Sequence, residues 1–240
     1  ISRMEGQGSG DVQAQWPHRT SSLDSKDRRL STSSAVEGDT SVERSVDTGR
    51  GFRQEARVLA GLCLVGFFVN CQPSEPFLTR FLIENKGLSE SQLDNQVWPW
   101  NIYGSFIFLL PVGLLAEVYG YRRIVFVGLL CREATRVLLL FTGGVAFMAL
   151  MQVTYAAATC ANTVYYAYAY MVVEPPRFQT TTSFMRASYH LGNVLGAVMG
   201  QIVVDNGGSL TLLFYLSWGF TTLGLICFLF LLPPPTRQPP

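Results

Sequence analysis

Long apolar segments with few charges are the feature that most restricts what this chain can fold into. Each is close to the roughly twenty residues that an α-helix needs to cross a bilayer. Short polar joints separate the segments. We therefore expect an all-α membrane protein with six transmembrane helices. They are placed near residues 56–79, 98–118, 124–142, 146–173, 181–204 and 210–232.

The first 54 residues differ sharply from the rest of the chain. They are rich in Ser, Thr, Gly, Asp and Arg and hold few large apolar side chains. Such a composition cannot bury enough apolar surface to offset the entropy lost on ordering. We expect residues 1–54 to form a disordered cytoplasmic tail and residues 55–235 to form the six-helix membrane domain. Residues 236–240 then begin a cytoplasmic central loop.

Basic residues in the joints set the expected orientation, because cytoplasmic loops of membrane proteins carry an excess of Lys and Arg. Arg57 lies at the start of the first span, Arg122 and Arg123 fill the joint between the second and third, and Arg177 follows the fourth. The opposite joints lean acidic or carry no charge. Both termini are therefore expected in the cytoplasm, with the plasma membrane as the expected location.

Two acidic side chains interrupt the apolar pattern. Glu75 ends the first apolar run and Glu117 ends the second. A carboxylate at the bilayer centre costs about 2.5–3.5 kcal/mol on insertion scales, so it is usually retained for function. Asn70, Gln72 and Pro73 also interrupt the first run, and a broken helix is tolerated at membrane depth only where it lines a cavity or is buried in protein. These features indicate a solute transporter.

The joint after the second span carries a recognisable motif. Residues 113–123 read G-x-L-A-E-x-x-G-x-R-R. This run resembles the signature of the 2–3 loop in the major facilitator superfamily, with Glu117 in place of the usual Asp. The alternative is an ordinary turn at Gly120 whose arginines stay on the cytoplasmic side. The resemblance implies gating roles for Glu117, Arg122 and Arg123.

The same resemblance has consequences for the fold. It implies that the six helices are the amino-terminal half of a major facilitator superfamily fold, whose two halves pack around a site at the bilayer midplane. The chain is therefore expected to be a fragment, with the second half of the same polypeptide missing from it.

A narrower resemblance lies in the first span. Residues 72–79 read Q-P-S-E-P-F-L-T, which is similar to the first-helix motif of the reduced folate and thiamine transporter family. Supporting matches are the Asn95-x-x-x-Pro99 motif, the tyrosines of 165–170, Arg186 and Gln201. The resemblance covers about residues 56–235 and implies a water-soluble vitamin as the substrate. It also implies substrate contacts for Glu75, Trp98, Asn101, Asn162 and Tyr165.

A polar and aromatic stripe runs along the fourth span. Its members recur at steps of three and four residues and so share one helix face. They are Tyr155, Thr159, Asn162, Tyr165 and Tyr166. The stripe either packs in the interior or forms a cavity wall, and the amide at its middle favours the wall. A cationic solute over a tyrosine face there gains about 0.5–2 kcal/mol.

Two further stripes lie on the fifth span. Gly192, Gly196 and Gly200 repeat at every fourth position, which allows close approach of another helix. His190 belongs to a polar stripe offset by about 100° on the helical wheel, which we expect to face the cavity. His190 there either titrates and couples protons or serves as a hydrogen-bonded structural residue.

The third span carries charges in mid-segment. Arg132 and Arg136 share a face, and Glu133 is spaced to pair with Arg136. They form either an internal salt-bridged cluster or a cationic wall for an anionic solute.

The identity of the substrate stays open between alternatives. Thiamine members of the resembled family carry Glu at the position of Asn162, and folate members carry Arg. Asn supplies no charge. Asn101 also replaces a Trp of the thiamine members. Thiamine is the favoured substrate, a reduced folate is the alternative, and a truncated six-span protein that transports nothing is the third possibility.

Several functions are not expected. No nucleophile–base arrangement, metal-ligand spacing or phosphate-binding loop stands out, so we expect no enzyme activity, no cofactor and no metal. The formal net charge is only +1, which argues against nucleic acid as a partner. The expected partners are the vitamin, the lipid bilayer and the missing second half.

Overall fold

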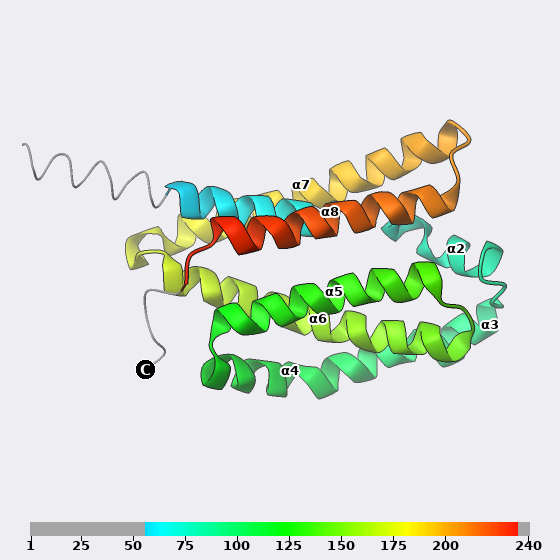
Figure 1. Ribbon diagram of the computed structural model, residues 1–240, viewed down its shortest axis with the longest axis horizontal. Helices are drawn as coiled ribbons and strands as arrows, with labels where there is room; N and C mark the ends of the chain where they lie inside the picture. Colours follow the sequence, from blue (N-terminus) through cyan, green and yellow to red (C-terminus); the bar gives the residue numbers. More distant parts are fainter. Residues whose placement is uncertain (1–55, 235–240) are drawn as a thin grey trace, which may run out of the picture. The chain divides into compact units, whose positions relative to one another are not determined.

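The computed structural model describes residues 56–234, and this part of the chain is a bundle of long α-helices (Figure 1). The first helix described covers residues 56–70. The other long helices are α4 (Pro99–Tyr119), α5 (Tyr121–Phe141), α6 (Val145–Val172), α7 (Phe178–Asp205) and α8 (Leu210–Leu231). No strand occurs in residues 56–234, so the expected all-α class is confirmed there. The expected tail and central loop lie outside the described residues.

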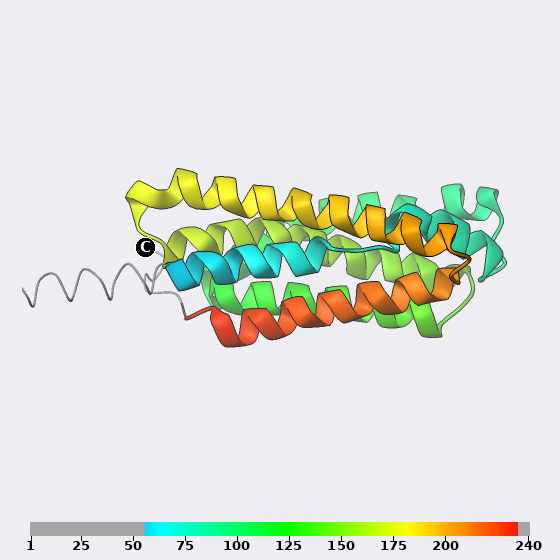
Figure 2. The same ribbon diagram turned by 90° about the horizontal axis from the view of Figure 1, so that it is seen from above.

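The helices form two layers. The first helix lies between α7 and α8 in one layer, and α4, α5 and α6 make the other (Figures 1 and 2). The core lies between the layers, where Leu62 of the first helix, Tyr168 of α6 and Phe228 of α8 are almost fully buried. Tyr168 also donates its hydroxyl to the Pro233 carbonyl, which ties α6 to the chain after α8.

Four segments of residues 56–234 are long and apolar enough to cross a membrane. They are Ala56–Glu84, Glu90–Tyr119, Val145–Val172 and Leu210–Leu231. Helices α5 and α7 have similar lengths, but α5 carries Arg132, Glu133 and Arg136 and α7 is rich in polar residues. The chain is therefore an integral membrane protein, and the expectation of six spans is met in part.

Large apolar side chains on the outside of the bundle agree with a lipid environment. Phe106 and Val118 of α4 are 78% and 76% exposed, and Phe230 of α8 is 82% exposed. Extended apolar surface of this kind is rare on a monomeric soluble protein. In a bilayer this surface contacts acyl chains, so its exposure carries no hydrophobic penalty.

The first apolar run breaks where its sequence predicts. The first helix ends at Asn70, the chain turns through Pro73, and it resumes as the short helices η1 (Glu75–Phe77) and α2 (Leu78–Glu84). Pro73 lacks the N–H that a continuing helix needs. The break is buried, and its side chains donate to carbonyls near the end of the first helix: Asn70 Nδ2 to Gly66 O at 2.7 Å and Gln72 Nε2 to Val69 O at 2.5 Å.

Two joints show how the chain reverses between helices. Gly120 connects α4 to α5 with a φ of 92°, a left-handed conformation that glycine adopts without steric cost. Just after it, Arg122 Nη2 donates to Leu229 O at 3.5 Å, in the last turn of α8. A cation there is favourable, because carbonyl groups without partners give a helix C-terminus partial negative charge.

The opposite end of the bundle is held by a lysine. Lys86 Nζ, in the joint after α2, donates to Leu140 O at 3.1 Å and to Thr142 O at 2.6 Å, at the C-terminus of α5. The same ammonium lies 5.7 Å from the centre of the Phe81 ring. Burial lowers the pKa of Lys86.

The glycine stripe of α7 lies directly against the broken first helix. A Cβ atom added at Gly192 would lie 2.5 Å from Phe67 O, and one at Gly196 would lie 2.7 Å from the Gln72 nitrogen. Gly200 meets the Pro73 carbonyl in the same way. Helix α7 therefore packs mainly on backbone atoms of the break, and the Phe77 ring is the side chain nearest to Gly200.

We expect Gly196→Ala to lower the free energy of unfolding by about 1–3 kcal/mol, because the new methyl group overpacks the buried break. The measurement is thermal or denaturant unfolding of the full-length protein in detergent. Gly219→Ala is the matched control, since a Cβ atom at this α8 position meets nothing within 4 Å. It should leave stability unchanged or raise it by up to about 1 kcal/mol. Equal effects of the two changes would contradict this packing.

Candidate functional site

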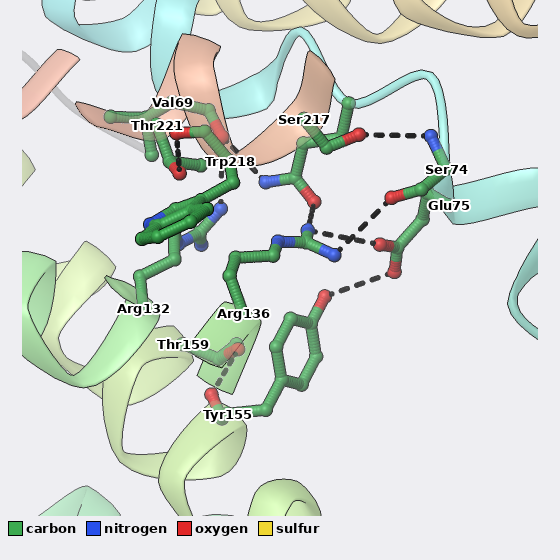
Figure 3. A network of polar contacts seen from close by, with 11 residues as sticks. Val69, Ser74, Glu75, Arg132, Arg136, Tyr155, Thr159, Ser217, Trp218 and Thr221 are labelled. Carbon is green, nitrogen blue, oxygen red and sulfur yellow. Dashed lines mark hydrogen bonds and ion pairs between the residues drawn. The ribbon is translucent and has the colours of Figure 1, made fainter. Parts of the chain in front are cut away.

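One arginine of α5 joins three residues of the broken first helix (Figure 3). Arg136 is 3% exposed. Its Nη2 donates to Gln72 Oε1 and lies 3.5 Å from Glu75 Oε2, and its Nη1 donates to Ser74 Oγ at 3.3 Å. The planar guanidinium presents several donors in a fixed geometry and can therefore hold several acceptors at once. Arg136 thus fixes the irregular segment as a unit.

Two more contacts hold the same segment. Arg132 Nη1, one turn before Arg136 on α5, donates to Val69 O at 3.2 Å. On the opposite side, the Ser74 backbone N–H donates to Ser217 Oγ of α8 at 3.0 Å. Ser74 and Ser217 are fully buried. The break is therefore held from both layers of the bundle.

Glu75 presents its carboxylate to open space while its cationic partner lies behind it. The Glu75 side chain is 45% exposed, whereas that of Arg136 is 4% exposed. From α6, the Tyr155 hydroxyl donates to Glu75 Oε1 at 3.4 Å, so an aromatic ring lies beside the acid (Figure 3). A half-exposed carboxylate next to a phenol ring can receive a cationic or amino-bearing group from outside the bundle.

The expected pairing of Glu133 with Arg136 is wrong. Glu133 Oε2 instead accepts hydrogen bonds from Trp218 Nε1 at 2.8 Å and Thr222 Oγ1 at 3.2 Å, both on α8. Successive helix residues are about 100° apart, so Glu133 faces α8 while Arg132 and Arg136 face the first helix. The two arginines do form an internal cluster, but its acid is Glu75, and both are too buried to act as an exposed cationic wall.

Part of the predicted stripe on α6 lines a small cavity. This cavity has a volume of about 30 Å³ and lies between the first helix, α5, α6 and α7. Asn162, Tyr165, Tyr166 and Arg132 are among its lining residues. The Tyr165 hydroxyl is already used, because it donates to Leu62 O at 2.5 Å. The cavity has room for about two water molecules, so it is too small for a vitamin ring.

The other predicted contacts lie elsewhere in the structure. Trp98 packs against an apolar cluster near the start of α4. Asn101 lines an open groove between α4 and α6 together with Thr159. His190 is exposed on α7, with its ring 5.2 Å from that of Tyr189. The predicted substrate residues therefore lie in several different places. Among them, only Glu75 belongs to the Arg136 network.

The predicted gating residues lie at one end of α4 and α5. Glu117 and Arg123 are exposed there, and Arg122 contacts α8 as described above. Ser217 and Trp218 were missed by sequence reasoning. Their partners, Ser74 and Glu133, are 143 and 85 residues away in the sequence, and no local pattern links such positions.

The fold and this network define an integral membrane protein with a broken helix and a half-exposed carboxylate in its first apolar segment. Residues 55–238 match the family model described as reduced folate carrier. This match covers well over half of the chain, and the chain therefore belongs to the reduced folate carrier family. The resemblance of residues 72–79 to the reduced folate and thiamine transporter family is thereby confirmed.

Curated relatives agree with this assignment. The chain is 35% identical to thiamine transporter 1 of Mus musculus over 60% of its length, which covers 29% of that protein. It is 32% identical to folate transporter 1 of Caenorhabditis elegans (69% of the chain, 36% of the relative) and 31% identical to the human reduced folate transporter (85% and 34%). The chain spans about a third of the length of these relatives. They are transporters, so the chain is not an enzyme.

Replacing Arg136 with Met should lower the free energy of unfolding by about 2–4 kcal/mol, because it leaves Gln72, Ser74 and Glu75 without their common donor. The measurement is unfolding of the full-length protein in detergent. Arg80→Met is the control: Arg80 and Glu84 are more than half exposed in their pair, whose loss costs about 0–1 kcal/mol. If both changes cost the same, Arg136 does not hold the break.

Proposed function

We propose that this chain is the amino-terminal half of a secondary transporter that moves a water-soluble vitamin by alternating access, with thiamine as the favoured substrate. The observation that carries this proposal is the half-exposed Glu75 carboxylate. It follows a buried break in the first helix, and Tyr155 lies beside it. The names of the relatives, which include thiamine and folate transporters, support a vitamin as the solute.

The substrate binds on the outer side of Glu75. The cavity beside Arg132 is too small for the whole molecule, so most of the vitamin occupies the space that Glu75 and Tyr155 face. The carboxylate receives the cationic or amino-bearing part, and the phenol ring contributes a cation–π contact. His190, which is exposed on α7, is a further proposed contact. Trp98, Asn101, Asn162, Tyr165 and Tyr166 remain proposed contacts that the family resemblance suggests.

A second helical bundle of the same polypeptide covers this space. The relatives are about three times as long as the matched region, which leaves length for such a bundle. Two bundles that rock about a shared midplane site give alternating access. In this arrangement α5 and α7 also cross the bilayer, giving six spans. Both termini of the chain lie in the cytoplasm at the plasma membrane, and Glu117, Arg122 and Arg123 gate the cytoplasmic side.

A reduced folate is the second candidate, and one observation favours it. Arg132 and Arg136 outnumber Glu75 in the network, so its net charge is positive. Such a field acts at a distance and favours the approach of an anionic solute, although neither buried guanidinium group contacts that solute.

Uptake of labelled thiamine and labelled folate by cells that express the full-length protein separates the candidates. We expect thiamine uptake to dominate and Glu75→Gln to reduce it about 10–100-fold, the equivalent of a lost charge-assisted hydrogen bond of about 1.5–3 kcal/mol. Glu84→Gln, which removes an exposed carboxylate of α2, should leave uptake unchanged.

Two results would count against thiamine. Folate uptake that exceeds thiamine uptake would favour the second candidate. Thiamine uptake that survives Glu75→Gln at the level of the Glu84→Gln control would remove Glu75 from the binding site. Expression at the cell surface is measured for each variant, so that a loss of uptake is distinguished from a loss of protein.

A further inference from the structure

Arg132 is a buried cation that lacks an ion-pair partner in the described part of the chain. It is 7% exposed, and it donates Nη1 to the neutral carbonyl of Val69. The nearest acid of the network, Glu75, forms its ion pair with Arg136. The neighbouring Glu133 is directed to Trp218 and Thr222 on α8. One carboxylate, Glu75, therefore serves two buried guanidinium groups, and buried charge that is not fully compensated is costly, so a further anion beside Arg132 would be favourable.

The small cavity described above lies next to this guanidinium. Its polar lining includes Asn70, Asn162, Tyr166 and Tyr189 as well as Arg132, and no carboxylate is among its lining residues. Amide N–H and phenol O–H groups can donate hydrogen bonds to an anion. At about 30 Å³ the cavity accommodates a monatomic ion or about two water molecules. Its charge and size therefore select a small anion over a cation or an organic solute.

We propose that this cavity binds a small inorganic anion, chloride, against the Arg132 guanidinium. The ion supplies the missing counter-charge and is contacted from the first helix, α5, α6 and α7. It stabilises the packing of these four helices behind the broken segment. Glu75 is not among the residues that line this cavity, so the anion does not occupy the place that we propose for the vitamin beside Glu75.

Thermal unfolding of the purified full-length protein in detergent tests this site. The midpoint is compared in sodium chloride and in sodium gluconate at equal ionic strength, because gluconate is too large for the cavity. We expect chloride to raise the midpoint by about 2–4 °C or more. Sodium bromide should have the same effect. Arg132→Gln should abolish the difference, and Arg80→Gln, which removes an exposed arginine, should preserve it.

A second variant keeps the test decisive if Arg132→Gln fails to fold. Asn162→Asp places a carboxylate in the cavity with Arg132, so the protein should fold and its midpoint should no longer respond to chloride. Crystals grown with bromide should show anomalous scattering in the cavity. Equal midpoints in chloride and gluconate for the unchanged protein would overturn the proposal. A full chloride response in Arg132→Gln or Asn162→Asp, or no bromide beside Arg132, would also overturn it.

Discussion

The contact between one buried guanidinium and a broken helix is the interaction on which this structure depends. Arg136 donates to Gln72 and Ser74 and pairs with Glu75, three nearby residues that no regular helix would present together. Without this donor, the buried side-chain oxygens of Gln72 and Ser74 would lose their hydrogen-bond partner, which is costly away from water. The arginine therefore makes the irregular segment compatible with its surroundings, and it determines where the Glu75 carboxylate is held.

The neighbouring helices are shaped around this segment. Helix α7 contacts it through glycines, α8 contributes Ser217, and α6 contributes Tyr155 to the acid. The cation lies on the inside and the carboxylate faces outward, so the pair is anchored yet accessible. This arrangement suits a site where a solute binds the Glu75 carboxylate while Arg136 keeps the broken segment in position.

The sequence was sufficient for features with a local cause. Pro73 predicts the end of the first helix, the motif around Gly120 predicts a turn, and the run at 72–79 indicates the family. The partner of Arg136 could not be predicted, because Glu75 is 61 residues away and helical spacing pointed to Glu133 instead. The α6 stripe shares one helix face, and its spacing predicts either interior packing or a single cavity wall. In the structure one member contacts Glu75, one lines the groove with α4, and the others line the small cavity beside the first helix. They are separated because the first helix packs on only part of this face of α6.

The central claim is that Glu75 faces a water-filled route and not lipid. Cysteine accessibility tests it directly, in full-length protein whose native cysteines, including the five of this chain, have been replaced. The account predicts that Glu75→Cys reacts with a charged, membrane-impermeant thiol reagent, whereas Leu110→Cys, on the outer face of α4, does not. Reaction of the cysteine at position 75 with a lipid-soluble maleimide alone would contradict it.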